Sequence, residues 1–222
     1  LRRRGPLYGV DFALRLPSVG ATMTLMMAAT QAGGTTILRG AACEPEICDL
    51  ANFLRACGAH ITGAGTPVVV IQGGKPLQGT AWTPLPDRIA AATYAAALAA
   101  AGGDIRITGC NPALYGAFLQ FLAQTGVQIE NGPDWAGLAR NPAVPLRGGV
   151  QLCADAWPAF ATDPAPLAAA VLLAAEGKSE IFDRLFPNRF ACAAGFAVAG
   201  AVGTVEAFKD QRNVFFSDAD TL

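Results

Sequence analysis

The residue with the clearest capacity for chemistry is Asp163, which lies in the segment 158–164, directly before an apolar stretch that runs to Glu176. An aspartate followed by proline is typical of a helix start, where backbone N–H groups point outward and packing needs no carboxylate. Two roles therefore stay open for Asp163. It is either the N-cap residue of that helix or a general base that removes a proton from a substrate hydroxyl.

Other side chains that could carry chemistry are few. His60 is the one histidine and alternates with apolar neighbours, which indicates a strand-surface residue rather than a catalyst. The six cysteines form no Cys-x-x-Cys pair, so a zinc site is not expected, and we predict no metal or other cofactor. We interpret the cysteines as small buried hydrophobic residues in a reducing cytoplasm. They are Cys43, Cys48, Cys57, Cys110, Cys153 and Cys192.

The composition excludes several classes of protein. Hydrophobic residues make up 52% of the 222 residues, which favours a globular core over disorder. A net charge of −1 provides no field for nucleic acid, and the basic residues 2–4 are only a terminal cluster. The alanine-rich run 89–101 is shorter than the ~20 residues of a membrane span, and the N-terminal segment does not have the pattern of a targeting signal. Because the chain starts with Leu1 and ends without a terminating element, we expect a fragment of a longer cytoplasmic protein.

The elements that must position these residues occur in a repeated order. An apolar helical run that ends in glycine precedes a short strand, and a second helix that ends in glycine precedes another strand. The closing glycines Gly58, Gly126 and Gly200 lie 68 and 74 positions apart. Predicted helices span 22–31, 44–57, 89–101, 111–125, 164–175 and 187–200. Predicted strands span 35–38, 60–62, 68–71, 104–107, 127–129, 150–152, 179–182 and 204–206.

A spacing near ~70 residues exceeds the 20–50 of most solenoid repeats, so each unit is predicted to be a small βαβαββ layer. The fold class is therefore α/β, with alanine-rich helices buried together and sheets outside. The prolines Pro84 and Pro86 punctuate the chain, and we place a domain crossover there. The predicted domains are residues 1–85 and residues 86–222.

Six motifs in register resemble the UDP-N-acetylglucosamine 1-carboxyvinyltransferase family of enolpyruvyl transferases, across nearly the whole chain. They are LPSVGAT at 16–22, AACEPEI with DLANFL at 41–54, GAGT at 63–66, PDRI at 86–89, PAFATD at 158–163 and NRF at 188–190. The resemblance implies an inside-out α/β barrel of two domains, each built from three such units, with the substrates in the cleft between them. This chain would cover the end of the first domain and the first two units of the second.

The resemblance also implies a reaction and its partners. The family moves the enolpyruvyl group of phosphoenolpyruvate onto the 3′-hydroxyl of UDP-N-acetylglucosamine and releases phosphate, which is the first committed step of peptidoglycan synthesis. A hydroxyl is a poor nucleophile until its proton is being removed, and Asp163 matches the family residue with that role. The expected partners are these two substrates and the missing parts of the same chain, with no nucleic acid and no membrane.

The remaining site residues follow from the same motifs. A helix N-terminus can present N–H groups to an anionic nucleotide, and the nucleotide-contacting positions are Leu16, Pro17, Ser18, Val19 and Gly20. Leu185 matches a backbone contact to the uridine, while Phe186 either covers the uracil or packs in the core. Arg189 is assigned to the phosphoenolpyruvate side. The interdomain polar positions are Glu44, Glu46, Asp87 and Arg88, of which the last two also suit a hinge.

Departures from the family pattern keep a second hypothesis open. Pro187, Ala90 and Ala161 replace a glutamate, an acidic residue and a proline, and residues 191–196 lack the expected pattern. The family's Lys-Asn pair, loop cysteine and loop arginines have no match in this chain. The alternatives are therefore a part of an active transferase, or a non-catalytic diverged relative that keeps the scaffold for nucleotide binding or interaction. The related shikimate-pathway enolpyruvyl transferase is a third interpretation, disfavoured by the motifs at 18–22 and 188–190.

Overall fold

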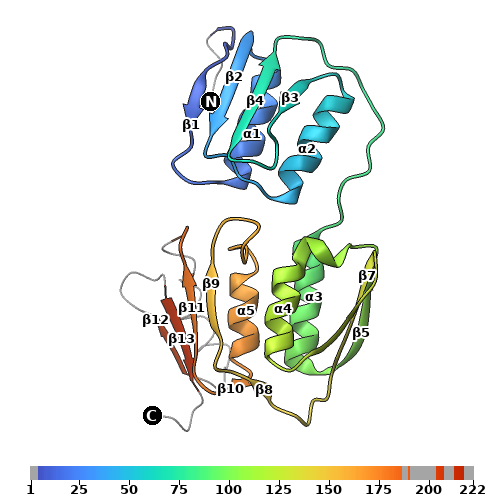
Figure 1. Cartoon of the computed structure of the whole chain (residues 1–222), viewed down its shortest axis with the longest axis vertical. Helices are drawn as coiled ribbons and strands as arrows, with labels where there is room; N and C mark the ends of the chain where they lie inside the picture. Colours follow the sequence, from blue (N-terminus) through green and yellow to red (C-terminus); the bar gives the residue numbers. More distant parts are fainter. Residues whose placement is uncertain (1–4, 187–189, 191–203, 208–212, 218–222) are drawn as a thin grey trace. The chain divides into compact units, whose positions relative to one another are not determined.

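The chain forms two compact units in a computed structural model (Figure 1). The structure describes residues 5–186, residue 190, and the backbone of residues 204–207 and 213–217. The first unit is Leu1–Leu85 together with Ala156–Pro158, and the second is Pro86–Asp155 together with Ala159–Leu222.

The first unit is a four-stranded sheet with two helices packed on it (Figure 1). Along the chain the order is β1 (Asp11–Ala13), α1 (Val19–Thr30), β2 (Gly34–Arg39), α2 (Pro45–Ala56), β3 (His60–Thr62) and β4 (Val68–Gly73). The sheet order is β1-β2-β4-β3, in which β1 and β2 are parallel and the other pairs are antiparallel. Buried residues of both helices and of the sheet, including Met26, Leu38, Ile47, Val69 and Ile71, form one hydrophobic core.

In the residues of the second unit that the structure describes, α-helices α4 and α5 both pack on α3, beside two larger sheets. Its first part is α3 (Arg88–Ala101), β5 (Gly103–Thr108), the 3₁₀ helix η1 (Pro112–Tyr115), α4 (Gly116–Gln124), β6 (Gln128–Asn131) and β7 (Trp135–Arg140). Its second part is β8 (Leu146–Arg147), β9 (Gln151–Ala154), α5 (Ala165–Leu172), β10 (Ala175–Glu176), β11 (Ser179–Asp183), β12 (Thr204–Ala207) and β13 (Asn213–Ser217). α3 contacts both α4 and α5, so small alanine side chains lie where these helices meet.

One strand order recurs in the sheets. The order β1-β2-β4-β3 of the first unit matches β9-β11-β13-β12 of the second, including the single parallel pair at one edge. The sheet β5-β7-β6 has the same order without the first strand. The described chain is thus α/β and built from related layers.

The closing glycines explain why two of the helices end where they do. Gly58 and Gly126 have positive φ angles of 101° and 100°, which glycine adopts without a steric penalty. After α2, Gly58 N donates to Arg55 O and Ala59 N donates to Leu54 O. After α4, the residues at the matching positions make the same two bonds, so both helices end in a Schellman motif. Gly200 lies outside the described residues.

Three predicted helix boundaries differ from the structure by more than one residue. The helix predicted over 22–31 starts earlier, at Val19, because Ser18 caps it. The helix predicted over 164–175 ends at Leu172, since residues 175–176 pair with β8. The helix predicted over 111–125 opens with a 3₁₀ turn at Pro112. The helix predicted over 187–200 lies outside the described residues.

Among the described residues, no helix has the length and apolar character that a membrane span requires.

Candidate functional site

The start of α1 carries the predicted nucleotide-contacting residues. Ser18 has extended backbone angles and its Oγ accepts a hydrogen bond from Ala21 N at 3.3 Å, so it is the N-cap residue. The first N–H groups of a helix have no acceptor within the helix. Gly20 is exposed, and a methyl group at its α-carbon would meet no other atom within 4 Å. This helix end is therefore open to an anionic group.

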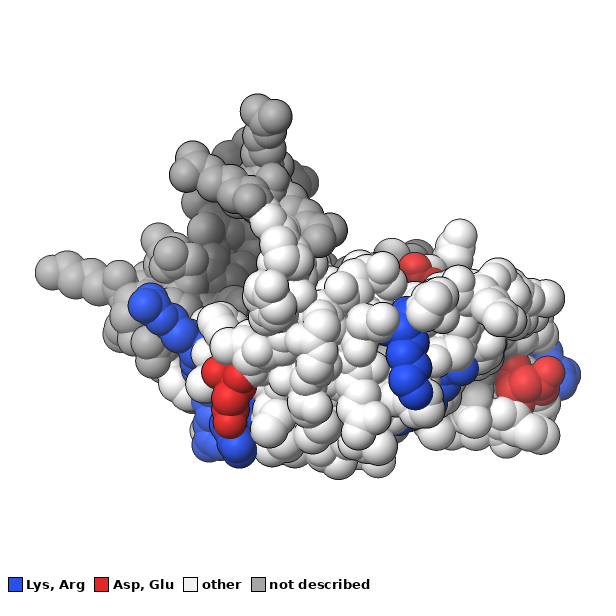
Figure 2. Space-filling model, turned by 90° about the horizontal axis from the view of Figure 1, so that it is seen from above, with Lys and Arg blue, Asp and Glu red and all other residues white. Residues whose placement is uncertain are grey.

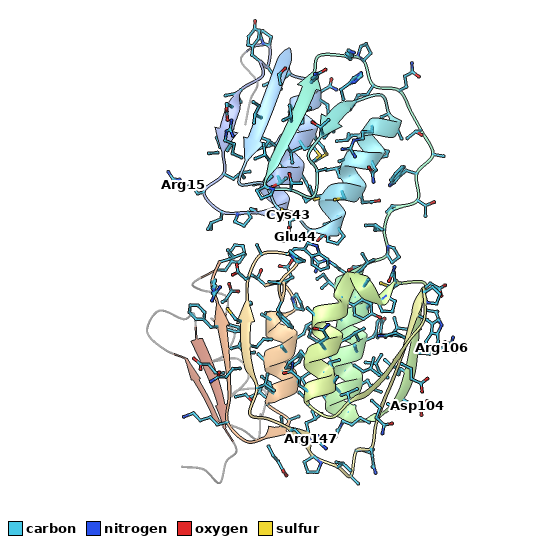
Figure 3. The ribbon with its side chains drawn as sticks, viewed as in Figure 1. Arg15, Cys43, Glu44, Asp104, Arg106 and Arg147 are labelled. Atoms are coloured by element: carbon cyan, nitrogen blue, oxygen red, sulfur yellow. The ribbon has the colours of Figure 1, made fainter. Side chains whose placement is uncertain are left out.

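Neighbouring side chains at this helix end differ in exposure. Leu16 is 44% exposed, whereas Pro17 and Val19 are half-buried. Arg15 is exposed and extends away from the sheet (Figure 3). It supplies a positive charge one residue before the predicted segment.

A buried hydrogen bond joins the start of α1 to the segment that leads into α2. Ala42 N donates to Thr22 Oγ1 at 3.0 Å, and both residues are fully buried. The bond brings the Leu16–Gly20 segment and the Glu44 and Glu46 positions to the same end of the first unit (Figure 3). Sequence reasoning missed Thr22 as the connecting residue, because its partner lies twenty positions away.

Glu44 and Glu46 lie at the first turn of α2. Glu44 is the N-cap residue by position and is only 8% exposed, but its side chain makes no capping hydrogen bond. Burial raises the pKa of the neighbouring Cys43 thiol, and the charges of Glu44 and Cys48 raise it further. At the start of α2, Glu44 therefore lies close to the Cys43 thiol, and that thiol stays protonated at neutral pH.

Asp87 begins α3 in the second unit. Its Oδ1 accepts hydrogen bonds from Ile89 N at 2.8 Å and Ala90 N at 3.0 Å, so the carboxylate is the N-cap of the helix. Arg88 is 6% exposed and is the one arginine or lysine that is buried among the described residues. Capping was not predicted for Asp87, although the sequence Pro-Asp before an apolar run is an N-terminal signal.

A buried phenol lies close to this helix start. Burial raises the pKa of Tyr115 to about 12, with a smaller contribution from the Cys110 charge. Burial likewise raises the pKa of the Cys110 thiol, with the Asp87 charge as the second cause. Neither group supplies an anion near neutral pH.

Asp163 is exposed and lies just before α5. The N-cap position belongs to Pro164, one residue later, so the interpretation of Asp163 as the N-cap residue is wrong. Ala165 N donates a hydrogen bond to Thr162 O, and the helical residues begin at Ala165. The helix therefore starts after the proline. Of the two roles that the sequence left open, the general base is the one that stays a prediction.

The end of β9 brings two predicted segments together. Ala154 pairs with Asp183 of β11 on one side and forms an isolated parallel bridge with Phe160 on the other. Asp155 N donates to Phe160 O, and Arg184 N donates to Ala154 O. The loop 160–163, which carries Asp163, and the turn 183–186 therefore lie beside the same strand end.

Asp183 fixes the second of these segments. It is fully buried, and its Oδ1 accepts hydrogen bonds from Leu185 N and Phe186 N, both at 2.9 Å. Leu185 and Phe186 are half-buried and stand outside the hydrophobic core. Because the Leu185 N–H is used by Asp183, a backbone contact of Leu185 to a ligand would use its carbonyl. Sequence reasoning missed Asp183, although aspartate directly after a strand is a turn signal. Arg189 lies outside the described residues.

Charged side chains are sparse on one face of the molecule. On the face shown in Figure 2, blue and red side chains stand in small separate groups among uncharged residues. Within the described part of the chain, no three residues among His, Cys, Asp and Glu are grouped so that they could hold a metal ion.

Comparison with known proteins assigns a family to this arrangement. The family model described as EPSP synthase (3-phosphoshikimate 1-carboxyvinyltransferase) matches residues 2–214. A UDP-N-acetylglucosamine 1-carboxyvinyltransferase of Bartonella tribocorum is 42% identical over 184 residues, which are 83% of this chain and 43% of that protein. The Hyphomonas neptunium protein of the same name is 42% identical over 200 residues, 90% of this chain and 47% of its own length. The chain thus spans less than half the length of these curated relatives.

Solved structures share the fold. The enolpyruvyl transferase NikO from Streptomyces tendae superposes with a TM-score of 0.74 at 24% identity, covering 96% of this chain and 52% of that one. An EPSP synthase from Acinetobacter baumannii superposes with a TM-score of 0.57 at 21% identity, covering 96% and 49%.

Proposed function

Because the chain belongs to the EPSP synthase (3-phosphoshikimate 1-carboxyvinyltransferase) family, we propose that it is part of an enolpyruvyl transferase acting on UDP-N-acetylglucosamine. The reaction joins the sugar 3′-oxygen to the enolpyruvyl carbon of phosphoenolpyruvate. The sugar hydroxyl loses its proton, and phosphate leaves. The product is committed to peptidoglycan, and the reaction takes place in the cytoplasm.

Relatedness supports the nucleotide-sugar acceptor over shikimate 3-phosphate. Relatives named for UDP-N-acetylglucosamine are 42% identical over more than four fifths of this chain. The EPSP synthase from Acinetobacter baumannii is 21% identical over a similar share. Because the identity to the first group is higher, UDP-N-acetylglucosamine is the better hypothesis for the acceptor of this chain.

The single observation that carries the mechanism is the meeting of the loop 160–163 and the turn 183–186 at the end of β9. Asp163 is exposed on that loop and is proposed as the general base for the sugar 3′-hydroxyl. Leu185 and Phe186 are held by Asp183 in the adjoining turn and are proposed to contact the uridine. A base and a recognition turn on one strand end would hold the acceptor in a fixed orientation.

In the first unit, the start of α1 is proposed to face the nucleotide. The Ser18 cap leaves N–H groups of the first turn directed at an approaching diphosphate, where the helix dipole favours negative charge. Leu16, Pro17, Val19 and Gly20 would line the same contact. Glu44, Glu46, Asp87 and Arg88 are proposed as polar groups between the two domains, and Arg189 as a contact to phosphoenolpyruvate.

The domain organisation is part of the proposal. Residues 1–85 would belong to the first enolpyruvyl transferase domain and residues 86–222 to the second, each an inside-out barrel with its helices inside. The recurring strand order and the contacts of α3 with α4 and α5 support that arrangement. The rest of each barrel would come from other parts of the protein.

A non-catalytic relative with the same scaffold is the second candidate. It is favoured by Pro187, Ala90 and Ala161, which stand where the family has a glutamate, an acidic residue and a proline. Such a protein would bind the nucleotide sugar without turning it over.

A chimera tests these alternatives. The 222 residues would replace the matching segment of the Bartonella tribocorum relative, and phosphate release from phosphoenolpyruvate would be measured with each acceptor. Release with UDP-N-acetylglucosamine but not with shikimate 3-phosphate is the expected result. Release with shikimate 3-phosphate alone would overturn the acceptor. A folded chimera that binds UDP-N-acetylglucosamine by calorimetry without releasing phosphate would favour the non-catalytic relative.

A further inference from the structure

Two cysteines occupy related positions at the start of α2. The helix has Glu44 at its N-cap and Pro45 at its first position, so Cys43 is the residue before the cap and Cys48 is the fourth helical residue. Side chains at these two positions commonly pack against each other across the first helical turn, an arrangement known as the hydrophobic staple. Here both positions are occupied by cysteines.

Both thiols line the same cavity. A cavity of about 670 Å³ in the first unit is lined by Cys43 and Cys48, with further lining residues Pro45, Asp49, Asn52 and Gly65. Both cysteines are half-buried, so small reagents can reach them from the cavity. The Cys43 thiol donates a weak hydrogen bond to Ala41 O at 3.7 Å, which holds it near the backbone before the helix.

Gly65 confines the second thiol. A methyl group at the α-carbon of Gly65 would lie 2.7 Å from Cys48 Sγ, closer than real contacts allow. The loop therefore covers one side of the Cys48 sulfur and leaves the cavity side open. The Gly65 φ angle of +85° makes glycine the residue suited to this close approach.

The other described cysteines differ in their setting. Cys57 and Cys110 are 7% and 4% exposed and belong to the core, while Cys153 is exposed on β9. Cys57 follows α2 at its far end, nine positions beyond Cys48 and thus ~14 Å along the helix axis. Among the described cysteines, Cys43 and Cys48 are the pair that shares a cavity.

We propose that Cys43 and Cys48 form an oxidisable dithiol that closes reversibly to a disulfide across the first turn of α2. With hydrogen peroxide as the oxidant, one thiol loses its proton, and the thiolate attacks a peroxide oxygen. The O–O bond breaks, the leaving hydroxide takes up the proton that the thiol released, and a sulfenic acid and water result. The second thiolate then attacks the sulfenic sulfur, the S–O bond breaks, and a disulfide and a second water form. Two thiols and one hydrogen peroxide give one disulfide and two waters.

The rate of closure depends on pH in a defined direction. The thiolate is the attacking species, and burial together with the neighbouring charges raises the pKa of Cys43. Closure is therefore slow at pH 7 and accelerates as the pH rises toward 9. A pair built this way would respond to strong oxidation rather than to ordinary cytoplasmic peroxide.

The sequence allows a direct test. Trypsin cleaves after Arg39 and Arg55, so the peptide 40–55 contains both cysteines and no other, while the next peptide, 56–88, contains only Cys57. The chain would be treated with hydrogen peroxide, remaining thiols alkylated with N-ethylmaleimide, and the peptides weighed. The expected result is a loss of two hydrogens in peptide 40–55 that dithiothreitol reverses, with Cys57 still alkylated.

Two test variants, one control variant and a second probe complete the test. Cys43→Ser and Cys48→Ser should each abolish the loss of two hydrogens, whereas Cys57→Ser should retain it. Phenylarsine oxide, which bridges two nearby thiols, should bind one equivalent in the parent chain and in Cys57→Ser but not in the first two variants. Recovery of peptide 40–55 with two alkylated thiols after oxidation, or arsenical binding that survives Cys43→Ser, would overturn the proposal.

Discussion

The carboxylate of Asp49 on α2 accepts a hydrogen bond from Trp82 Nε1 at 3.3 Å, thirty-three positions further along the chain. Its second oxygen accepts from Leu85 N, also at 3.3 Å, and the Trp82 ring lies 6.2 Å from that of Phe53. The segment after β4 is thereby fixed to α2 as far as Leu85, while Asp87 is fixed to α3 as its cap. The anchored segment thus ends at Leu85, the last residue of this stretch of the first unit, and α3 of the second unit begins at Arg88.

Asp49→Ala should release the segment from α2. Both hydrogen bonds are partly exposed to water, so the free energy of unfolding should fall by only about 1 kcal/mol. Iodide quenching of tryptophan fluorescence should nevertheless increase, because Trp82 loses its acceptor and its place beside Phe53. The exposed Asp104 on β5 provides the control, since Asp104→Ala should leave quenching unchanged. Equal quenching of the parent and Asp49→Ala would show that the carboxylate does not hold the segment.

Tyr115→Phe should raise the free energy of unfolding at neutral pH. It should also reduce the fall of that free energy at alkaline pH. Among the described residues, the buried Tyr115 hydroxyl has no hydrogen-bond partner, so its removal should stabilise the fold by about 1 kcal/mol. The pKa of Tyr115 is about 12 in the folded chain against 10 in a free phenol. The unfolded state therefore loses the proton first, and stability falls as the pH rises from 10 to 12.

Urea denaturation at pH 7, 10 and 11 measures this effect. The difference in unfolding free energy between Tyr115→Phe and the parent should grow from pH 7 to pH 11. Tyr94 is 67% exposed, so Tyr94→Phe should follow the parent at each pH. A difference that is constant with pH would assign the effect to packing alone.

Much of the local structure was predictable because it depends on neighbours in the sequence. The strand His60–Thr62 and the glycines that close α2 and α4 follow from periodicity and from the positive φ that glycine supplies. The pairing of Ala154 with both Asp183 and Phe160 was not predictable, because it depends on which distant segments meet. The same reason explains why Thr22 and Asp49 were missed as anchoring residues, since their partners lie twenty or more positions away. Asp183 differs, because it anchors residues two and three positions further on, so a local turn signal could have revealed it.

Asp183→Ala should destabilise the turn that holds Leu185 and Phe186. The buried carboxylate accepts two backbone hydrogen bonds at 2.9 Å, and removing it leaves two N–H groups without that acceptor. The expected loss is about 3 kcal/mol. Asp183→Asn keeps an oxygen that can accept both bonds and should lose less than half as much.

The same pair of variants tests the proposed uridine contact. In the chimera, Asp183→Ala should weaken UDP-N-acetylglucosamine binding by calorimetry at a temperature where the variant is folded, and Asp183→Asn should restore most of it. Unchanged binding by folded Asp183→Ala would separate the turn from nucleotide recognition.

Asp163→Asn should lower turnover in the chimera by about 10²-fold or more, because general-base catalysis typically contributes 10²–10⁴ to the rate. The amide has nearly the same shape but cannot take the proton of the sugar hydroxyl, so affinity for UDP-N-acetylglucosamine should change little. Since Asp163 is exposed and is not the N-cap residue of α5, its replacement should change the melting temperature only slightly. Asp104→Asn, at an exposed position of the same unit, should keep full turnover. An unaltered turnover number for Asp163→Asn would remove this carboxylate from the reaction, and an equal loss in turnover and in stability would give it a structural role instead.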